Sequence, residues 1–220
     1  MGPSPGPINP IPSTSRTSIA ACNPHRTKPQ DMLIILDLNG TLIYREESFR
    51  PRNPKFITRP YLPEFLEYLF GNFQVMVWSS ASRNTINEIV RTWPFDDHRS
   101  ALVAKWNRHH TGIAAADYHA RVHTYKNLEN VWASDEIQKH HPEYSAGKRY
   151  NQDNTILLDD SWPKASAQPF NVIKVPTYQG NSGDNEDIFG EVWTYLELLR
   201  RQPDVSNYMH KRPFRNSGFA

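Results

Sequence analysis

Four short segments carry the side chains that could do chemistry. Asp37-Leu-Asn-Gly-Thr41 follows one run of apolar residues, Ser79–Ser80 follows a second and Asp159–Asp160 follows a third. Lys126 stands just before a segment with helical spacing. If these segments meet at one crevice, they bring together carboxylates, a hydroxyl pair and an ammonium group, which suits the binding and transfer of a phosphoryl group.

The carboxylates predict a metal ion. Adjacent carboxylates at a buried edge repel one another, so a cation is expected among them. Mg²⁺ fits, because it takes one or two carboxylates and keeps positions for water and phosphate oxygens. Asp37 could then attack phosphorus and form an acyl-phosphate. Lys126, Ser79 and Thr41 could hold the phosphoryl oxygens in the transition state.

Alternating strands and helices are predicted to position these groups. Apolar runs indicate buried strands, and apolar residues at helical spacing indicate helices. The expected strands are Met32–Leu36, Phe73–Trp78, Thr155–Leu158 and Asn171–Val175, and the expected helices are Leu62–Phe70, Ser82–Trp93, Asn127–Ile137 and Asp187–Arg201. Residues 95–125 are expected to be irregular, with strand-like pieces near 101–106 and 121–125. The order predicts an α/β fold with a mostly parallel sheet, whose ligands bind beyond the carboxyl ends of the strands.

The chain divides by composition into three parts. Residues 1–30 are rich in Pro, Ser, Thr and Asn and are expected to form a disordered arm, because they cannot bury enough surface to offset the ordering entropy. Residues 31–202 are expected to form one domain, which agrees with a length of 220 residues. Residues 203–220 are expected to be a loop-like basic tail with Lys211, Arg212 and Arg215.

Charge and cysteine content exclude several classes. The chain has 25 Lys plus Arg against 23 Asp plus Glu, so its overall charge gives no case for direct nucleic-acid binding. Its single cysteine, Cys22, excludes a disulfide framework and a cysteine zinc site within one chain. No apolar run approaches the roughly 20 residues of a membrane span, and no signal-peptide core is present. An intracellular location, nuclear or cytoplasmic, is expected, and the acid-poor leader leaves a mitochondrial location as the alternative.

Four motifs in order resemble those of the haloacid dehalogenase (HAD) superfamily. Leu36-Asp-Leu-Asn-Gly-Thr-Leu42 resembles the first motif, and Val77-Trp-Ser-Ser-Ala81 resembles the second. Tyr125-Lys-Asn-Leu128 looks like the third, and Leu157-Leu-Asp-Asp-Ser161 resembles the fourth. The spacing is similar to the NLI-interacting-factor-like branch, which contains phosphatases of the RNA polymerase II carboxy-terminal domain (CTD) and a mitochondrial import-receptor subunit. Each motif alone is weak, whereas four in order at predicted element boundaries are specific.

The resemblance implies a three-layer HAD-like fold and a role for each site residue. Asp37 would be the nucleophile, with Ser79, Ser80, Lys126 and Thr41 binding phosphate. Mg²⁺ would be held by Asp37, Asp159 and the backbone carbonyl of Asn39, with Asp160 beside it. No large cap is expected, and the insert before the third motif is short. An open crevice implies a phosphorylated protein segment as substrate, RNA polymerase II C-terminal repeats among the candidates, and Trp106 and Tyr118 in the insert could contact an extended peptide.

Asn39 departs from the family pattern. The family usually has a second Asp there, which protonates the leaving oxygen and then activates water. An amide can do neither, and losing general acid–base help typically costs ~10²–10⁴-fold in rate. Three outcomes stay open: a slow Ser/Thr phosphatase, a phosphate-binding or partner-binding pseudoenzyme with an import-receptor-like role among its forms, or an acid from elsewhere. Candidates for that acid in the insert are His109, His110, His119 and His123.

The paired histidines do not predict a zinc site. Adjacent residues do not face one direction on a helix, and no cysteine accompanies His109-His110 or His140-His141. Both pairs are therefore expected at the surface. Asn39-Gly40 is also a pair in which the amide could deamidate to Asp, although a rigid strand end would oppose the cyclisation.

Overall fold

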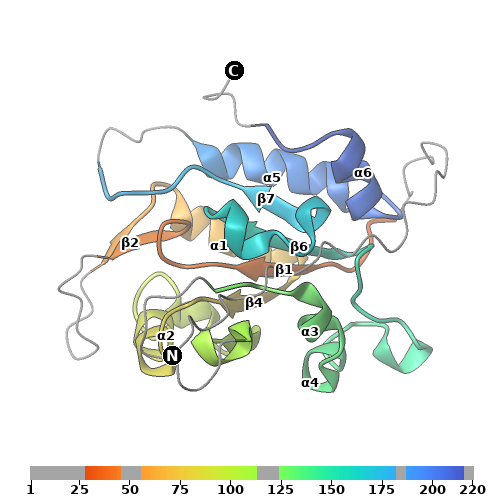
Figure 1. Ribbon diagram of the computed structural model, residues 1–220, viewed down its shortest axis with the longest axis horizontal. Helices are drawn as coiled ribbons and strands as arrows, with labels where there is room; N and C mark the ends of the chain where they lie inside the picture. Colours follow the sequence, from red (N-terminus) through yellow and green to blue (C-terminus); the bar gives the residue numbers. More distant parts are fainter. Residues whose placement is uncertain (1–27, 46–55, 113–123, 182–186, 216–220) are drawn as a thin grey trace, which may run out of the picture.

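A five-stranded parallel sheet forms the centre of the molecule (Figure 1). The computed structural model describes residues 28–45, 56–112, 124–181 and 187–215. Within them the strand order is β5-β4-β1-β6-β7. The strands are β1 (Leu33–Leu36), β4 (Gln74–Trp78), β5 (Leu102–Trp106), β6 (Thr155–Asp159) and β7 (Val172–Lys174). The α/β fold class predicted from the sequence is confirmed.

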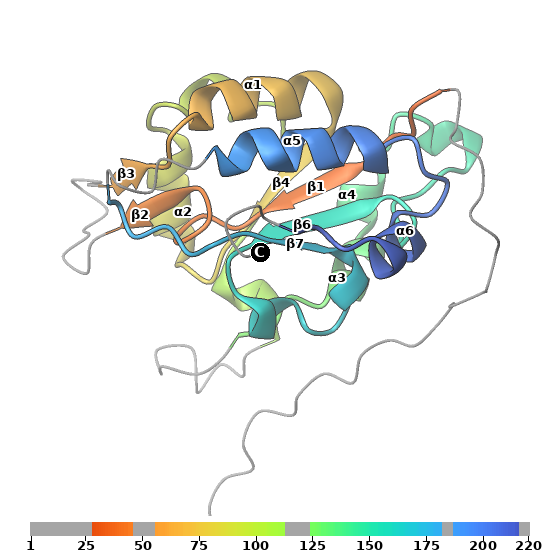
Figure 2. The same cartoon turned by 90° about the horizontal axis from the view of Figure 1, so that it is seen from above.

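Helices cover both faces of this sheet. Leu33 and Ile35 of β1 pack on one side, whereas Ile34 and Leu36 pack on the other, as the two-residue period of a strand requires. The helices on the Ile34 side are α1 (Leu62–Asn72), α2 (Arg83–Val90), α5 (Ile188–Leu199) and α6 (Val205–Lys211), and those on the Leu33 side are α3 (Leu128–Trp132) and α4 (Asp135–Gln138). Helices α1 and α5 run side by side (Figure 2).

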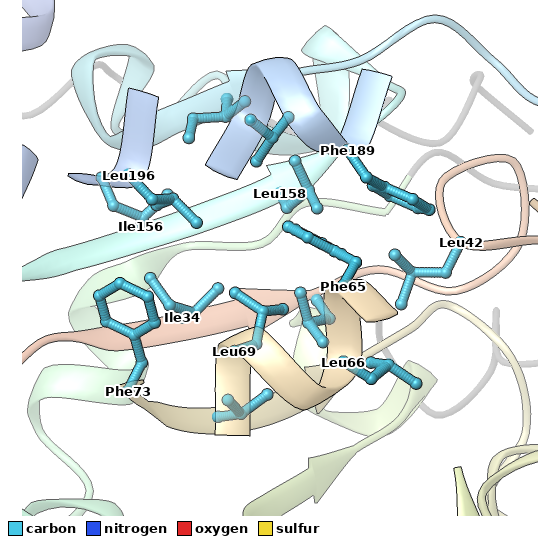
Figure 3. Packing of buried hydrophobic residues seen from close by; sticks show 14 of the residues in the cluster. Ile34, Leu42, Phe65, Leu66, Leu69, Phe73, Ile156, Leu158, Phe189 and Leu196 are labelled. Atoms are coloured by element: carbon cyan, nitrogen blue, oxygen red, sulfur yellow. The ribbon is translucent and has the colours of Figure 1, made fainter. Parts of the chain in front are cut away.

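Aromatic packing joins these two helices above the first strand. The rings of Phe65 on α1 and Phe189 on α5 stack with centroids 4.4 Å apart and planes 8° apart. Leu42 and Leu158, which lie just beyond β1 and within β6, meet the same rings (Figure 3). Burying an aromatic side chain contributes a large share of core stability. The core therefore reaches the two loops that carry the first and fourth motifs.

A small antiparallel ribbon follows the first motif. It pairs β2 (Ile43–Arg45) with β3 (Phe56–Thr58). None of the strands expected from the sequence lies between Leu36 and Phe73, so this ribbon was missed. Short 3-10 helices complete the described part: η1 (Asp96–His98), η2 (Arg108–Thr111), η4 (Tyr144–Ala146), η5 (Trp162–Ala165) and η6 (Pro169–Asn171).

Two helix predictions need correction. The expected helix Asn127–Ile137 is two short helices, α3 and α4, with Ala133 ending one and Ser134 preceding the other. Loop was expected from 203 onwards, yet α6 forms there, because Asp204 accepts a capping bond from the Asn207 amide at 2.8 Å.

Both ends of the described chain are tied to the core. Val205 of α6 is buried with the main hydrophobic cluster. At the other end, the amide of Gln30, expected within the disordered arm, donates to the Arg200 carbonyl at 2.8 Å. Packed chain therefore extends on both sides of the expected boundaries at 31 and 202. Residues 1–27 and 216–220 lie outside the described residues, as do 121–123 of the strand-like piece expected near 121–125.

Candidate active site

The predicted polar residues gather at the carboxyl edge of the sheet. Asp37 follows β1, Ser79 follows β4, and Asp159 ends β6. Because β4, β1 and β6 are parallel neighbours, their carboxyl ends open onto one crevice. The Asp37 amide donates to the Leu158 carbonyl at 3.0 Å, which fixes the first motif against the fourth.

Lys126 lies between two of the carboxylates. Its Nζ donates to Asp37 Oδ1 at 2.8 Å and to Asp159 Oδ2 at 2.6 Å, and its side chain is fully buried. Burial alone would lower its pKa, but the two carboxylates outweigh it and raise the pKa of Lys126. The ammonium is therefore held charged between its partners. Lys126 therefore supplies, from the chain itself, part of the positive charge that was expected among the carboxylates.

Asp37 keeps one oxygen without a hydrogen bond. Oδ1 is taken by Lys126, whereas Oδ2 is buried and has no hydrogen-bond partner among the described residues. Burial raises the pKa of Asp37, as does the nearby Asp159, while Lys126 and Lys164 oppose the rise. A buried carboxylate oxygen without a partner is costly unless a ligand or ion completes it. This oxygen is therefore the natural contact point for a metal ion or a reacting group.

Lys164 is a site residue that the sequence reasoning missed. Its Nζ lies 3.8 Å from Asp37 Oδ2, and its side chain is one-quarter exposed. The Lys126 amide donates to the Lys164 carbonyl at 2.7 Å, so the two lysines are joined through the backbone. The available signal was a lysine four residues after Asp160, at the strand end where ligands bind.

Asp160, Gly40 and Thr41 form a close junction between the first and fourth motifs. The Asp160 amide donates to Thr41 Oγ1 at 3.0 Å, and that hydroxyl lies 3.4 Å from Asp160 Oδ1. Gly40 has φ +86°, and a Cβ there would stand 2.5 Å from Asp160 Oδ2. Glycine is therefore required twice, by backbone conformation and by the carboxylate against it. The Thr41 hydroxyl, expected to touch phosphate, is engaged by Asp160.

A buried arginine supports this junction from behind. Arg59 donates through Nη1 to the Thr41 carbonyl at 2.8 Å and through Nη2 to the Pro176 carbonyl at 2.6 Å. The Tyr178 amide donates to the Gly40 carbonyl at 2.7 Å. These bonds fix the loop that aims Asp37. Nothing in the sequence around Arg59 distinguished it from a surface arginine, so it was missed as well.

Asn39 lies on the open side of the same loop. Its side chain is exposed, and its Oδ1 accepts a 2.8 Å bond from the Arg45 amide. Burial lowers the pKa of Arg45, while the charge of Asp37 opposes this. A third positive side chain, after Lys126 and Lys164, therefore approaches Asp37 from β2. The first-motif loop carries an amide where an acid was expected and an arginine where no site residue was predicted.

The carboxylates have the spacing and chemistry of a divalent-ion site. Ligand oxygens of Asp37, Asp159 and Asp160 all lie within 4.8 Å of one another. Opposite oxygens around Mg²⁺ are about 4.2 Å apart, so a small contraction would close the site. The partnerless Asp37 Oδ2 is one of the available oxygens. Three carboxylates against one buried ammonium also leave negative charge for a divalent ion to balance. The residues therefore fit Mg²⁺.

Within the described part of the chain, the other residues predicted for the site are not hydrogen-bonded to Asp37 or Asp159. Ser79 is buried, and its Oγ accepts from the Ala81 amide at 3.4 Å, while Ser80 is half-buried at the same strand end. His109 and His110 lie on η2, and the Asn107 amide donates to His110 Nδ1 at 3.2 Å. His119, His123 and Tyr118 lie outside the described residues. His141, expected at the surface, is buried, because its ring packs at 4.8 Å against Tyr150.

A comparison with protein families agrees with this arrangement. The profile described as "NLI interacting factor-like phosphatase" matches residues 32–206. The chain belongs to this family. The resemblance inferred from the four motifs is thereby confirmed, and the matched region contains Asp37, Ser79, Lys126 and Asp159.

Members of the NLI interacting factor-like family and solved structures share the region. An FCP1 homology domain-containing protein of Schizosaccharomyces pombe is 37% identical over 194 residues, covering 83% of this chain and 77% of its own. A CTD phosphatase-like protein of Invertebrate iridescent virus 6 is 27% identical, covering 79% and 96%. The fission yeast RNA polymerase II CTD phosphatase Fcp1, solved with beryllium fluoride, aligns at 14% identity and TM-score 0.47 over 82% of this chain. This chain spans 55% of that protein.

The helices of this family member are short. Among residues 28–45, 56–112, 124–181 and 187–215, no helix has the length and apolar character to cross a membrane.

Proposed function

We propose that this protein is a Mg²⁺-dependent phosphoprotein Ser/Thr phosphatase that works through an aspartyl-phosphate on Asp37. The observation that carries the proposal is the division of labour between the two oxygens of Asp37. Oδ1 is fixed by Lys126, whereas Oδ2 has no hydrogen-bond partner and has Lys164 at 3.8 Å. A carboxylate held by one oxygen presents the other in a defined direction, which is what a nucleophile needs.

The proposed reaction has two displacements. Asp37 Oδ2 forms a bond to phosphorus while the bond from phosphorus to the substrate oxygen breaks, and the departing alkoxide takes a proton from solvent water. Water then attacks the phosphorus of the acyl-phosphate, releases inorganic phosphate and restores the Asp37 carboxylate. Both steps place charge on the phosphoryl oxygens, so fixed positive groups around them lower the barrier.

The two lysines divide the electrostatic work in this scheme. Lys126 is fully buried and bonded to Asp37 and Asp159, so it orients the nucleophile and favours its ionised form. Lys164 is partly exposed and lies beside the attacking oxygen, so it meets the phosphoryl group. Ser79 and Ser80, at the end of the neighbouring strand β4, would donate to the remaining phosphoryl oxygens. This assignment moves the direct phosphate contact from Lys126 to Lys164.

Mg²⁺ would be held by side chains of Asp37, Asp159 and Asp160, with the Asn39 carbonyl as a further ligand. When bound, the ion neutralises charge on the phosphoryl oxygens as they approach a carboxylate-rich site. The 4.8 Å spacing of the three carboxylates supports this ligand set.

Asn39 limits the turnover rate of the proposed enzyme. An amide at this position can neither protonate the leaving oxygen nor activate water, as the usual carboxyl group would. We therefore expect slow turnover, greatest with substrates whose leaving oxygen needs no proton, such as aryl phosphates.

The proposed substrate is a phosphorylated segment of a protein. The names of the relatives refer to CTD phosphatases, so the C-terminal repeats of RNA polymerase II are the first peptides to test. The described segment after the first motif holds only the ribbon β2–β3, which supports an open crevice. An intracellular location, nuclear or cytoplasmic, accompanies this substrate.

The second candidate function is phosphopeptide binding without turnover. The specific observation in its favour is Asn39, whose amide removes a negative charge from the path of an incoming phosphate and is tied to the Arg45 amide at 2.8 Å. Under this alternative the same crevice binds phosphate and does not release it as product.

The deciding experiment combines turnover with trapping. Hydrolysis of p-nitrophenyl phosphate with Mg²⁺ is expected for the wild-type chain and is expected to vanish in Asp37→Asn. The amide oxygen of that variant can still accept from Lys126, so the variant is expected to fold. Its thermal midpoint and circular dichroism spectrum check this. Asp97→Asn, at an exposed site on η1, is the matched control.

Beryllium fluoride with Mg²⁺ should form a complex seen by fluorine NMR in the wild-type protein and not in Asp37→Asn. Hydrolysis that survives in Asp37→Asn contradicts the nucleophile. Phosphopeptide binding in calorimetry with no phosphate released over hours selects the second function.

A further inference from the structure

A groove runs along the free edge of the sheet, next to the candidate active site. It has a volume of about 570 Å³ and is lined by all five residues of β5, Leu102–Trp106. Helix α2 forms one wall with Arg83 and Arg91, and the other wall contains His110 and Glu136. The groove is thus bounded by helices from opposite faces of the sheet, with a strand edge as its floor.

The floor of this groove can form backbone hydrogen bonds. β5 pairs on one side with β4, and no other strand of the described residues pairs with its outer side. In a parallel pair, alternate residues of an edge strand turn their N–H and C=O groups outward. Such an edge is a template for a further strand. Five residues at about 3.3 Å each give an edge of about 17 Å, which matches a peptide of about five residues.

The charge of the groove selects the kind of strand. Arg83, Arg91 and Lys105 line it, and His110 adds a group that is positive when protonated. Among the residues that the structure describes, Glu136 is the one carboxylate in the lining, and Arg91 has a distant partner in Glu88 at 3.8 Å. The chain as a whole carries only +2, so this groove is more basic than the average surface. A basic groove favours an acidic partner and speeds its association.

The groove ends at the candidate active site. The carbonyl of Trp106, the last residue of β5, accepts from the Ser79 amide at 3.0 Å, and the Arg108 amide donates to the Ala81 carbonyl at 3.1 Å. A strand bound along β5 would therefore finish beside the loop after β4. A phosphorylated residue a few positions further along the same peptide could enter the crevice.

We propose that the groove along β5 binds an extended acidic peptide, which adds to the sheet as a strand beyond β5. The role of this peptide as the flank of the phosphorylated residue rests on the proposed phosphatase function, whereas its binding does not. The interaction combines backbone hydrogen bonds to the edge with ion pairs to Arg83, Arg91 and Lys105. It would select phosphoproteins that carry acidic residues beside the phosphorylated position.

Binding of an unphosphorylated peptide tests the site apart from catalysis. The probe is a fluorescein-labelled decapeptide of alternating Glu and Thr, followed by anisotropy against the full chain at low salt. Wild-type protein is expected to bind it and to ignore the Lys–Thr counterpart. The double variant Arg83→Glu/Lys105→Glu should weaken binding by about ten-fold or more, since two ion pairs become repulsions.

The control has the same total charge. Lys148→Glu/Arg201→Glu changes two exposed positive residues away from the groove and should leave the affinity unchanged. Glu at position 83 lies in the first turn of α2, where an acidic side chain is favourable, so loss of the fold is not expected. Equal loss of affinity in both double variants would mean that net charge alone attracts the peptide, and the groove would be rejected.

Strand addition has its own test. Methylating alternate backbone amides of the probe keeps its sequence and charge but removes the donors of one edge. One of the two alternating registers is expected to lose binding, because it blocks the amides that face β5. Undiminished binding of both registers would overturn strand addition.

Turnover separates this proposal from the proposed function. If the phosphatase is active, Arg83→Glu/Lys105→Glu should raise KM for an acidic phosphopeptide and leave kcat/KM for p-nitrophenyl phosphate unchanged. If no turnover is found, the anisotropy experiment still tests peptide binding, because it does not depend on catalysis. An equal loss on both substrates would contradict a separate peptide groove.

Discussion

At the residue scale, the candidate site is a problem of charge balance. Three carboxylates lie within 4.8 Å of one another, and a fully buried ammonium lies between two of them. Burying such groups costs several kcal/mol per ion unless each charge is compensated. Lys126 compensates part of the charge, and Lys164 approaches the remaining oxygen of Asp37. The site is therefore organised before ligand arrives, and its three carboxylates still exceed the two lysines, which leaves negative charge for a cation to balance.

Asn39→Asp should speed turnover. The new carboxylate can still accept from the Arg45 amide, so the loop should keep its shape, and its second oxygen can supply the missing acid and base. We expect kcat for p-nitrophenyl phosphate to rise through the restored base alone. The rise should be larger for phosphoserine, whose alkoxide leaving group also needs the acid, since general acid–base help contributes ~10²-fold or more. Asn39→Ala is the control, because it removes the amide without adding an acid. An Asn39→Asp protein no faster than wild type would mean that another group does this work.

Lys164→Met should weaken phosphate binding without unfolding the protein. The side chain is one-quarter exposed and 3.8 Å from Asp37 Oδ2, so its loss removes a charge from the site and little from the core. A hydrogen bond to a charged group contributes roughly 1.5–3 kcal/mol, which corresponds to about 10–100-fold in kcat/KM. Inhibition by inorganic phosphate should weaken in parallel, while the thermal midpoint stays close to wild type.

Lys148→Met, at an exposed position away from the site, is the matched control for that experiment. If Lys164→Met lowers the thermal midpoint and leaves phosphate inhibition untouched, Lys164 has a structural role and the assignment of phosphate contact to it is wrong.

At the element scale, the strands of the parallel sheet were predicted better than the helices, whereas the ribbon β2–β3 was missed. Buried parallel strands are continuous apolar runs, and β1, β4 and β6 appear within a residue of their expected places. The interval Asn127–Ile137 also has apolar spacing, but packing against the sheet divides it into α3 and α4. Helix α6 was missed because its seven residues bury only Val205, Ser206 and Met209, a pattern too short to stand out in sequence.

The segment around His141 should make stability depend on pH. The Glu143 amide donates to His141 Nδ1 at 3.0 Å, and burial lowers the pKa of this ring below its ordinary value of 6.5. Below about pH 6.5 the unfolded chain takes up a proton before the folded chain does, so the free energy of unfolding falls with pH until the folded pKa is reached. Urea unfolding at pH 7.5 and pH 5.5 measures the loss.

His141→Gln keeps an acceptor for the Glu143 amide and cannot titrate. Its stability should therefore fall less between the two pH values than that of wild type. His140→Gln, the exposed neighbour, should behave like wild type. A loss of equal size in His141→Gln would assign the pH dependence to other groups, among them His110, whose pKa burial also lowers.

At the scale of the whole molecule, topology explains why the sequence revealed the site and not its surroundings. Chemistry at the carboxyl edge follows from parallel strands, so Asp37, Ser79 and Asp159 could be placed together from strand ends alone. Arg59 and Lys164 reach the site through the tertiary path of loops, which no local pattern encodes. The groove along β5 likewise depends on which strand ends the sheet, a property of the fold rather than of any motif.

Mg²⁺ should stabilise the whole fold through the same carboxylates. A ligand that binds only the folded state adds RT ln(1 + [L]/Kd), or about 1.4 kcal/mol at ten times Kd. We expect the thermal midpoint to rise with Mg²⁺ at constant ionic strength, and the rise to shrink in Asp160→Asn, where one ligand charge is lost. The Asn39→Ala protein should keep the rise, because Asn39 would bind through its backbone carbonyl. About 10 mM Mg²⁺ is the highest concentration worth testing for a site that binds the ion in cells. If the thermal midpoint does not rise at this concentration, Lys126 and Lys164 already balance the carboxylates. The metal would then bind only together with phosphate. A thermal unfolding scan with both Mg²⁺ and phosphate should then show the rise in midpoint that Mg²⁺ alone did not give.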